Sequence, residues 1–425
     1  MTNLFNKFYK KTRDERLSIL LSEHYLDDKD YCLFKNNSPL DNDVANSLIE
    51  NQLTQFPLPL GVALNFLIDG EEKIIPMVVE EPSVIAACSN AAKLARPNGF
   101  KTSIETYLKR GQIILTGVTN PNDAKKLILS QVDKIKEVAD NAHPSIVKRG
   151  GGLKEITCDI FESENGDDTF LTVYLLVDVQ KAMGANIINT ILEGVTPLIV
   201  DLVGGEALMS ILSNYNTESL VTSTCSIPFD KLGNQSTSGK NIAQRIEKAT
   251  QYANLDTYRA VTHNKGIMNG IDSVVIATGN DPRAVSAAAH AYASKNGTYQ
   301  SMTEWHVQDE YLVGKLTLPM SIGSVGGAIS VLPMAQANLN MMSISTSEEL
   351  ARIIVSVGLA QNLAALKALV SDGIQKGHMK LHASSLAIQV GATGDEIEQV
   401  TEKLRQSPHM NTQTATDILN QLRQK

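Results

Sequence analysis

The spacing of apolar and polar positions changes several times along the chain, and each change predicts a different element. Helical spacing over 12–25 and 41–51 predicts two amphipathic helices, the second of which begins with capping aspartates. An apolar run over 73–80 predicts a strand, and a run rich in Ala and Ser over 83–96 predicts a closely packed helix. The N-terminal part therefore mixes helices with β-structure.

A regular order of elements follows between about 109 and 216. A strand over 112–118 precedes a long helix over 120–141, and two alternating strands flank the turn sequence NGDD. A helix that begins at Gly184 and a strand over 207–215 complete the order β-α-β-β-α-β. That order predicts a ferredoxin-like domain, whose two ends lie close together and suit insertion into a larger domain.

Helices and β-segments alternate again over 217–375. An apolar run over 273–280 predicts a buried strand, and the segment 315–323 predicts another. Helical spacing then predicts two successive helices, over 347–360 and 361–374.

The last segment, 376–425, is polar with helical spacing and holds too few apolar residues for a core of its own, so a mobile helical C-terminal flap is expected. The predicted fold class is therefore α+β. A large helix-rich α/β domain, at 1–108 and 217–375, would carry an inserted ferredoxin-like domain at 109–216 and the flap at 376–425.

Composition and charge narrow the class of protein. Of 425 residues, 43% are hydrophobic and 20% charged, which is typical of a globular protein. The net charge of −8 disfavours nucleic acid or an anionic membrane surface as the main partner. The four cysteines form no CxxC pair, and the charged N-terminal segment lacks the apolar stretch of a signal peptide. Since no run approaches the roughly 18 apolar residues of a membrane helix, we expect a soluble cytoplasmic protein.

Two segments of the first two thirds of the chain carry residues suited to catalysis. The segment EEPS over 80–83 stands at a predicted strand-to-helix junction, where its side chains could take part in chemistry. Acidic residues and a proline also suit the first turn of a helix, so a structural role stays open. In the predicted loop THNKGIMNGID over 262–272, Lys265 could stabilise negative charge on a substrate carbonyl, and a solvated lysine is the alternative.

Two further segments hold an aspartate and two histidines. Asp281 in GNDP follows a predicted strand, at the edge where α/β sheets bind ligands, and it also suits a helix N-cap. His378 and His382 in GHMKLH are spaced to share a helical face, but no HExxH glutamate or third ligand accompanies them, so no metal is expected. A general acid at one of the two histidines that acts after flap closure, or two surface histidines, are the other interpretations.

Glycine-rich segments match neither the Rossmann nor the P-loop pattern. They are RGGG over 149–152, AMGAN over 182–186 and GSVGG over 323–327. Gly184 follows a predicted strand and opens a helix, which suits a phosphate group at the helix N-terminus.

Taken together, these segments resemble the 3-hydroxy-3-methylglutaryl-coenzyme A (HMG-CoA) reductases, closest to the soluble bacterial class II form. The resemblance runs in order over about 41–390 and is carried by EEPSVIAA (80–87), AMGAN (182–186), YRAVTHNKGIMNGID (258–272), ATGND (277–281), GLAQNL (358–363) and GHMKLHA (377–383). The chain departs from the family pattern at Lys181, where Asp is usual, and at ENQLT (50–54) in place of ENVIG.

The resemblance implies a set of site residues. The catalytic positions fall on Glu81, Lys265, Asp281 and His378. The positions that hold the HMG group fall on Ser83, Arg259 and Asn362, with Gln361 beside them. The cofactor positions fall on Met183, Gly184, Ala185 and Asn186, with His143 and Gly326 as further candidates. The coenzyme A contacts stay open, with Lys10, Lys11 and Arg13 as loose candidates.

The resemblance also implies the reaction. HMG-CoA would be reduced to mevalonate and free coenzyme A by two hydrides from NADPH, and NADH stays possible. Lys265 would stabilise the oxyanion, Asp281 would hold Lys265, and Glu81 would protonate the aldehyde oxygen. His378 would protonate the departing thiolate. The ferredoxin-like domain would bind the nucleotide, and the family implies a homodimer with active sites at the subunit interface. A higher oligomer of dimers stays open.

Preference for NADPH is expected from the neighbourhood of His143. In relatives that use NADH, a ribose-binding aspartate aligns near this position. A neutral or positive His143 with Lys148 and Arg149 close in sequence favours the 2′-phosphate of NADPH. Asp140 is the alternative, as an acceptor of the ribose hydroxyl that would favour NADH.

The sequence leaves three other functions to compare with this one. A metal-dependent dehydrogenase would use His378 and His382, and a non-catalytic coenzyme A-binding scaffold would use none of the catalytic residues. The presence of all four catalytic residue types argues against a scaffold. The same enzyme working in mevalonate degradation has the same sequence signature, so the physiological direction stays open.

Overall fold

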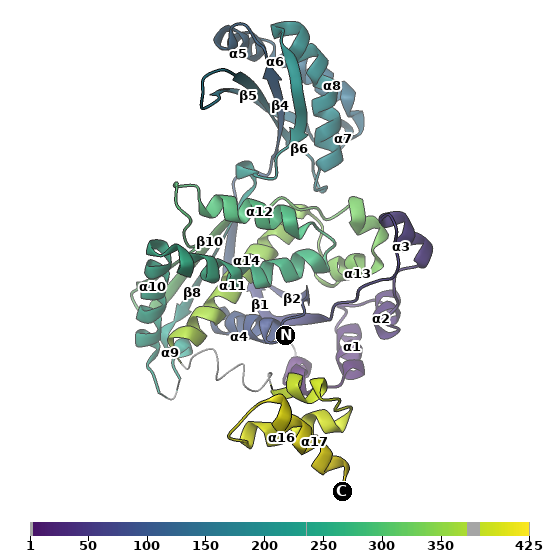
Figure 1. The fold of residues 1–425 in the computed structure, drawn as a ribbon, viewed down its shortest axis with the longest axis vertical. Helices are drawn as coiled ribbons and strands as arrows, with labels where there is room; N and C mark the ends of the chain where they lie inside the picture. The colour runs from purple at the N-terminus through teal and green to yellow at the C-terminus, as the bar shows by residue number, and fades with distance from the viewer. Residues whose placement is uncertain (1–2, 235, 372–382, 425) are drawn as a thin grey trace.

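The structure, a computed structural model, describes residues 3–234, 236–371 and 383–424. Its parts are stacked along one axis, with a central domain built on a six-stranded sheet (Figure 1). A smaller domain with a four-stranded sheet lies at one end, and the C-terminal helices lie at the other. The fold is therefore mixed α/β, as the sequence predicts.

Short helices open the chain and pack on the central domain. They are η1 (Asn3–Phe5), η2 (Phe8–Lys10), α1 (Arg13–Ser22), α2 (Asp28–Lys35) and α3 (Asn42–Leu48). A reciprocal capping box between Thr12 and Glu15 starts α1, and Asp41 caps α3. The apolar faces of α1 and α2 pack with Ile74 and Met341 of the central domain, which anchors this segment.

The central sheet has the strand order β2-β1-β3-β8-β10-β9. Its strands are β1 (Leu60–Ile68), β2 (Glu71–Val78), β3 (Phe100–Ile104), β8 (Leu220–Pro228), β9 (Thr303–Gln308) and β10 (Tyr311–Pro319). Only β1 and β3 pair in parallel. The helices of this domain are α4 (Val84–Ala95), α9 (Phe229–Leu232), α10 (Gly239–Leu255), α11 (Thr257–Ala277), α12 (Pro282–Ala293), η4 (Gly327–Val331), α13 (Pro333–Met341) and α14 (Ser347–Val370).

The smaller sheet is antiparallel throughout, with the order β5-β6-β4-β7. Its strands are β4 (Lys109–Thr116), β5 (Gly152–Glu162), β6 (Thr169–Asp178) and β7 (Glu206–Leu212), and its helices are α5 (Pro121–Ser130), α6 (Val132–Ala142), α7 (Pro144–Lys148) and α8 (Ala185–Val203). This sheet order with β-α-β-β-α-β connections is a ferredoxin-like arrangement. The single helix expected over 120–141 is interrupted at Gln131, so it forms α5 and α6.

Each part of the molecule has its own hydrophobic core. One apolar cluster fills the central domain and a second fills the ferredoxin-like domain. The C-terminal helices α16 (Asp395–Gln406) and α17 (Thr412–Arg423) enclose a third, which includes Leu386, Val400, Leu404 and Leu419. The expectation that this segment has too few apolar residues for a core was therefore wrong, because helical spacing gathers those few on facing sides.

The expected loop over 262–272 and the expected strand over 273–280 were both wrong. Residues 262–277 belong to α11, which ends at Ala277 and which Asp256 caps by accepting the backbone N–H of Tyr258 and Arg259. The apolar residues of this helix are buried at helical spacing, and a Cβ at Gly270 would lie 2.9 Å from the Cβ of Gln361 in α14. The glycine thus permits close helix packing, and the run SVVIA is a buried helix segment, which a short apolar run cannot distinguish from a strand.

The two helices expected over 347–360 and 361–374 are one continuous helix, α14. This helix and α8 are long and apolar enough to cross a membrane by composition alone. Residues of α14 lie in the core of the central domain, and one face of α8 packs on the smaller sheet. Helix α14 therefore has the packing of a core helix, and α8 that of a helix with one face on a sheet.

Candidate active site

A lysine–glutamate ion pair joins two of the expected catalytic residues. Lys265 Nζ in α11 donates to Glu81 Oε2 at 2.7 Å, and Asn269 Nδ2 donates to the same oxygen at 3.4 Å. Lys265 and Asn269 are one helical turn apart, so they reach Glu81 from the same face of α11. The side chains of Lys265 and Glu81 are 59% and 37% exposed, so the pair is open to a substrate.

The turn that carries Glu81 has unusual backbone geometry. Ser83, the residue before α4, has a φ of 78°, in the left-handed region that non-glycine residues rarely adopt. Its side chain makes no capping hydrogen bond with the helix. Such backbone strain often occurs at functional sites. Because the Ser83 hydroxyl does not cap the helix, it can contact a ligand. The expectation that Ser83 binds substrate stays a prediction.

Asp281 starts α12 as an N-cap. Its Oδ1 accepts the backbone N–H of Arg283 at 2.9 Å and of Ala284 at 3.3 Å, and Arg283 Nε lies 3.2 Å away. Burial acts to raise the pKa of Asp281, but these hydrogen bonds and the Arg283 charge together lower it below the ordinary value. No hydrogen bond or ion pair among the described residues joins Asp281 to Lys265, so the role of holding the lysine stays a prediction.

Asn280, beside Asp281, holds the loop after β10, which contacts the candidate cofactor segment at Met183. Its amide donates to the carbonyl of Gly323 at 3.0 Å and accepts the N–H of Gly323 at 2.8 Å. A Cβ at Gly323 would lie 2.5 Å from the backbone nitrogen of Met183, so only glycine permits this approach. The sequence pattern gave Asn280 no role, although it lies inside the GNDP segment.

The candidate cofactor residues lie where the two domains meet. Gly184, with φ 98°, precedes α8, and a Cβ there would lie 2.7 Å from Val179. The first turn of α8 contains no acidic residue, so its positive end is available to an anion. Met183 and Ala185 line a small cavity together with Asn214 of the ferredoxin-like domain and Ala284 of α12.

The other cofactor candidates lie on separate segments. Gly326 belongs to the loop after β10, which contacts the segment just before Met183 and Gly184. There the N–H of Ser324 donates to the carbonyl of Lys181 at 2.9 Å. His143 joins α6 to α7, and its Nδ1 lies 3.3 Å from Ser145 Oγ. The described contacts leave both assignments as predictions.

The expected HMG-binding residues differ in exposure. Arg259 near the start of α11 is partly buried, and burial lowers the pKa of its guanidinium. Gln361 is buried in α14, and its Oε1 has no hydrogen-bond partner among the described residues. Since a buried acceptor without a partner costs free energy, this oxygen suits a polar ligand.

Asn362 is 1% exposed and belongs to a buried polar cluster. Its Oδ1 accepts Trp305 Nε1–H at 2.7 Å and the Thr303 hydroxyl at 2.9 Å, and its Nδ2 lies 3.1 Å from His263 Nε2. Burial, and secondly the charge of Arg259, lower the pKa of His263 to about 3, so the ring is neutral at neutral pH. These contacts fix the orientation of the amide from inside the protein.

The remaining expected catalytic residue, His378, lies outside the described residues, as does His382. Within the described ranges, no group of three or more His, Cys, Asp or Glu side chains is arranged to hold a metal. Of the loose coenzyme A candidates, Arg13 donates to the carbonyl of Lys35 at 3.2 Å, which orders α1 on α2.

Asn269 and Asp272 are functional candidates to which sequence reasoning gave no role. Asn269 contacts Glu81, and its spacing of four from Lys265 would have indicated this had the segment been predicted as a helix. Asp272 Oδ1 is buried without a partner among the described residues, and burial raises the pKa of Asp272 to about 6. No local pattern marks that residue.

Comparison with known sequences gives a family match over most of the chain. The sequence model of the hydroxymethylglutaryl-coenzyme A reductase family matches residues 12–383. The whole chain is 43% identical to 3-hydroxy-3-methylglutaryl-coenzyme A reductase of Archaeoglobus fulgidus and covers 95% of that protein. A probable reductase of the same name from Borreliella burgdorferi is 34% identical over 90% of this chain and 86% of its own length.

Solved structures give the same result. A 3-hydroxy-3-methylglutaryl-coenzyme A reductase from Streptococcus pneumoniae matches with a TM-score of 0.85 and 44% identity, covering 98% of this chain and 99% of that one. A structure of the class II enzyme from that organism, bound to NADPH in open conformations, matches with a TM-score of 0.83 over 97% and 100% of the two chains. The chain belongs to the HMG-CoA reductase family.

Proposed function

We propose that the chain is an NADPH-dependent oxidoreductase that reduces HMG-CoA to mevalonate and free coenzyme A. The observation that carries this proposal is the Lys265–Glu81 pair at 2.7 Å, in a chain whose family match spans residues 12–383. A lysine ammonium held by a carboxylate suits a reaction that develops negative charge on a carbonyl oxygen and then protonates it.

The residues at the domain junction fit a nicotinamide cofactor. The N-terminus of α8 offers backbone N–H groups without a competing carboxylate in its first turn, which suits a pyrophosphate. We assign Met183, Gly184, Ala185 and Asn186 to cofactor binding, with Gly326 and His143 as further contacts. NADPH, when bound, supplies the hydride for each of the two reduction steps.

Lys265 and Glu81 act on the same oxygen of the substrate. Lys265 stabilises the negative charge that forms on the thioester oxygen, and again on the aldehyde oxygen in the second step. Glu81 lies next to that ammonium, and after taking up a proton from solvent it delivers, in its protonated form, the proton that makes the alcohol. Asn269 holds the Glu81 carboxylate from the next turn of α11.

The other two catalytic assignments complete the proton transfers. His378 protonates the coenzyme A thiolate as it leaves, because a histidine has a pKa near neutrality and the thiolate would otherwise attack the aldehyde. Asp281 stays ionised under its lowered pKa and adds negative charge that favours the Lys265 ammonium.

The HMG carboxylate is assigned to Arg259, which can form a bidentate pair with it. Ser83, Gln361 and Asn362 are assigned to the rest of the HMG group. The buried Gln361 Oε1 and the strained Ser83 turn support these assignments. The flap carries His378 to the site, and the ferredoxin-like domain brings the cofactor.

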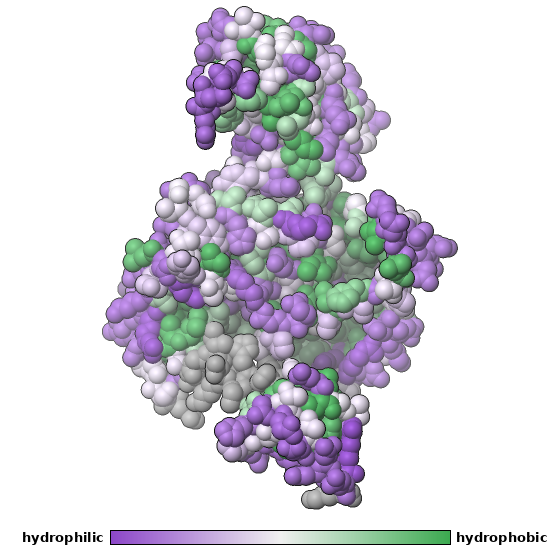
Figure 2. All heavy atoms as spheres, in the orientation of Figure 1, coloured by the Kyte–Doolittle hydropathy of each residue, from purple (hydrophilic) through white to green (hydrophobic). Residues whose placement is uncertain are grey.

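We further propose a homodimer in the cytoplasm with active sites at the subunit interface. Large apolar side chains are exposed on the central domain, including Leu53, Phe56, Leu255 and Tyr258, at 95%, 89%, 84% and 89%. Figure 2 shows apolar surface on the central part of the molecule near α3. A second copy of the chain would bury such surface, since monomeric proteins rarely leave large apolar patches exposed.

The test is an assay of the purified protein with HMG-CoA, following oxidation of NADPH and, in parallel, of NADH. Two molecules of NADPH should be consumed for each free thiol released. Mevaldehyde should serve as a substrate for the second step alone. His378→Gln should slow HMG-CoA reduction more than mevaldehyde reduction, since only the first expels a thiolate. Absence of thiol release with wild-type protein would refute the proposed function.

A further inference from the structure

The chain passes between the two sheets at two places that lie side by side. One crossing is the segment 105–108 between β3 and β4, and the other is 213–219 between β7 and β8. Strand β3 pairs with β8 in the central sheet, and β4 pairs with β7 in the smaller one. The N–H of Leu108 donates to the carbonyl of Glu218 at 3.1 Å, so the two crossings form one ribbon.

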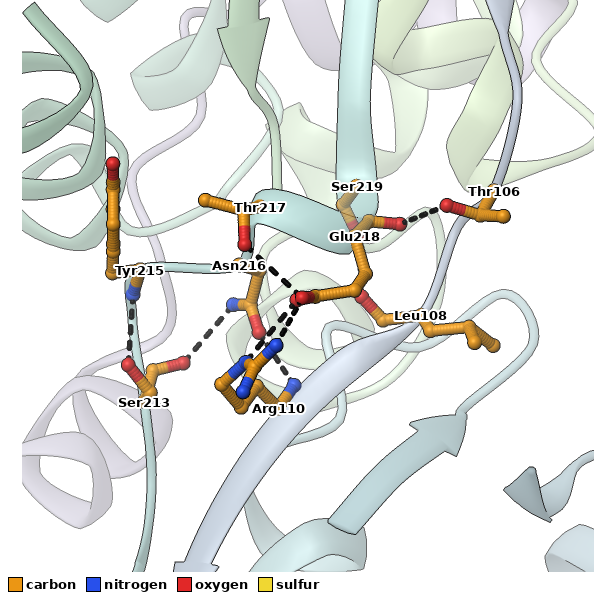
Figure 3. Close-up of polar contacts among 9 residues, drawn as sticks. All are labelled: Thr106, Leu108, Arg110, Ser213, Tyr215, Asn216, Thr217, Glu218 and Ser219. Atoms are coloured by element: carbon orange, nitrogen blue, oxygen red, sulfur yellow. Dashed lines mark hydrogen bonds and ion pairs between the residues drawn. The ribbon is translucent and has the colours of Figure 1, made fainter. Parts of the chain in front are cut away.

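An ion pair lies across this ribbon. The Arg110 guanidinium at the start of β4 pairs with the Glu218 carboxylate, with Nε 3.3 Å from Oε2 and a second contact from the terminal nitrogen to Oε1 (Figure 3). The two side chains are 23% and 19% exposed. Thr217 also donates to Glu218 Oε1 at 3.1 Å, and Arg110 lies over the ring of Tyr174 at 4.7 Å.

A buried asparagine ties the same crossing to both domains. Asn216 is 3% exposed, and its Oδ1 accepts the backbone N–H of Arg110 at 2.6 Å (Figure 3). Its Nδ2 donates to the carbonyl of Ser213 at 3.0 Å and to Ser321 Oγ in the central domain at 3.1 Å. All of its polar atoms are therefore engaged, and they span the junction.

A second layer of contacts lies beside these residues. The fully buried Lys109 Nζ donates to Ser219 Oγ at 3.2 Å and sits 3.6 Å from the ring centre of Tyr107. Tyr107 donates to the carbonyl of Met320 at 2.7 Å, which continues the contact into the central domain. The junction is thus a packed polar network, and a flexible linker would show few such contacts.

We propose that Arg110, Asn216 and Glu218, here called the interdomain clasp, are positioning residues that hold the ferredoxin-like domain at its working angle on the central domain. This inference rests on the proposed function. The cofactor residues 183–186 and His143 are carried by the smaller domain, whereas Lys265 and Glu81 are carried by the central one. The angle between the domains therefore sets the distance from the hydride to the substrate carbonyl.

The clasp has features suited to that task. Its ion pair is partly buried and bidentate, and loss of one partner leaves the other charge poorly solvated. Each partner also contacts a different neighbour, Tyr174 in the smaller domain and Thr217 in the crossing. Hydride transfer tolerates little misplacement, so a small change of angle slows chemistry without removing any group that touches the ligands.

The experiment compares Arg110→Met, Glu218→Gln and the double variant with wild-type protein. Each single variant should lower kcat roughly 10- to 100-fold, as a misplacement of about 1 Å does. The double variant should lose no more than either single one, because both changes remove the same interaction. Arg110→Lys keeps the positive charge but loses the planar guanidinium that contacts both carboxylate oxygens, so kcat should fall by an intermediate factor. It also provides a variant that folds if Arg110→Met does not.

The affinity for NADPH and the distance between the domains are measured separately from kcat. The affinity for NADPH, from its fluorescence on binding, should be unchanged, because the cofactor residues are intact. Trp305 in β9 is the single tryptophan of the chain, so energy transfer from it to bound NADPH reports the distance between the domains. That transfer should change in the clasp variants and recover in part in Arg110→Lys.

The matched control is Glu72→Gln, which breaks a partly exposed ion pair with Arg96 inside the central domain. It should leave kcat and energy transfer as in wild type. An unchanged kcat in the clasp variants, an equal loss in the control, or a fall in kcat without any change in energy transfer would each overturn the inference. If wild-type protein binds NADPH but does not reduce HMG-CoA, the proposed function fails, and the energy-transfer result still decides whether the clasp sets the angle.

Discussion

The ammonium of Lys265 is held by one carboxylate and remains half open to solvent, which is the arrangement a substrate carbonyl needs. Replacement of Lys265 by Ala should lower kcat/KM at least about 100-fold for both HMG-CoA and mevaldehyde, because both steps develop oxyanion character. Steady-state kinetics with each substrate measure this. Lys248→Ala, on an exposed position of α10, is the control. Activity with either substrate within about tenfold of wild type would remove Lys265 from the mechanism.

Asp272 makes the stability of the protein depend on pH. Burial raises its pKa to about 6, so the folded state binds a proton more tightly than the unfolded state does. Its contribution to stability is therefore present at low pH and is lost as the pH rises through about 6. Asp272→Asn removes the ionisable group, so the variant should not lose this stability as the pH rises.

The free energy of unfolding of Asp272→Asn, relative to wild type, should rise by about 1–2 kcal/mol between about pH 4 and pH 8, after allowance for solvent screening. Denaturant unfolding at several pH values measures the difference. Asp168→Asn, at an exposed turn position between β5 and β6, should show no such trend. A difference that is flat with pH would mean that Asp272 is solvated in the folded state.

We expect cofactor choice to depend on position 143 in the ferredoxin-like domain. His143 begins α7, and Lys148 and Arg149 lie at the other end of that short helix. A carboxylate at 143 would repel the 2′-phosphate of NADPH and accept the ribose hydroxyl of NADH. His143→Asp should therefore shift the ratio of kcat/KM values towards NADH, from a wild type that prefers NADPH. A wild-type preference for NADH, or an unchanged ratio, would point to Asp140 as the ribose ligand.

At the scale of elements, we expect the start of α8 to bind the cofactor. Gly184 has a positive φ and no room for a Cβ, whereas Gly204 at the other end of α8 has φ 70° and open space around it. Gly184→Ala and Gly204→Ala should each destabilise the fold by about 1–3 kcal/mol through backbone strain. Only Gly184→Ala should also weaken NADPH binding, which fluorescence titration measures. Equal affinity in both variants would separate α8 from the cofactor.

The separate cores of the whole molecule predict the effect of losing the C-terminal segment. Its apolar cluster contains no residue of the central domain. Deletion from Lys376 onward should therefore leave thermal unfolding and the dimer nearly unchanged while turnover almost disappears, because His378 is lost. Calorimetry, sedimentation and the HMG-CoA assay measure the three quantities. A dissociated dimer or an uncooperative transition would show that this segment completes the main core.

The order of elements in the ferredoxin-like domain could be predicted because each strand and helix there has a clear period. Strands β5 and β6 alternate around a polar turn, and α8 begins at a glycine and carries a buried apolar face. Capping positions such as Asp41 and Asp281 could be predicted for the same reason, since a cap is a local hydrogen-bond requirement. The types of residue in the candidate site could also be recognised from the sequence, because each short motif holds them at a fixed spacing along the chain.

The tertiary structure decided what local patterns leave open. The segment THNKGIMNGID is helical because Gly270 lets α14 pack closely, and burial against α14 outweighs the low helix propensity of glycine and asparagine. The contact of Asn269 with Glu81, the buried setting of Asn362 and the raised pKa of Asp272 all depend on neighbours far away in sequence. So does the clasp, whose partners are 108 residues apart. The spacing of apolar residues along the chain predicts local secondary structure and caps. The contacts, burial and pKa shifts named here depend instead on which parts of the chain pack together in the folded protein.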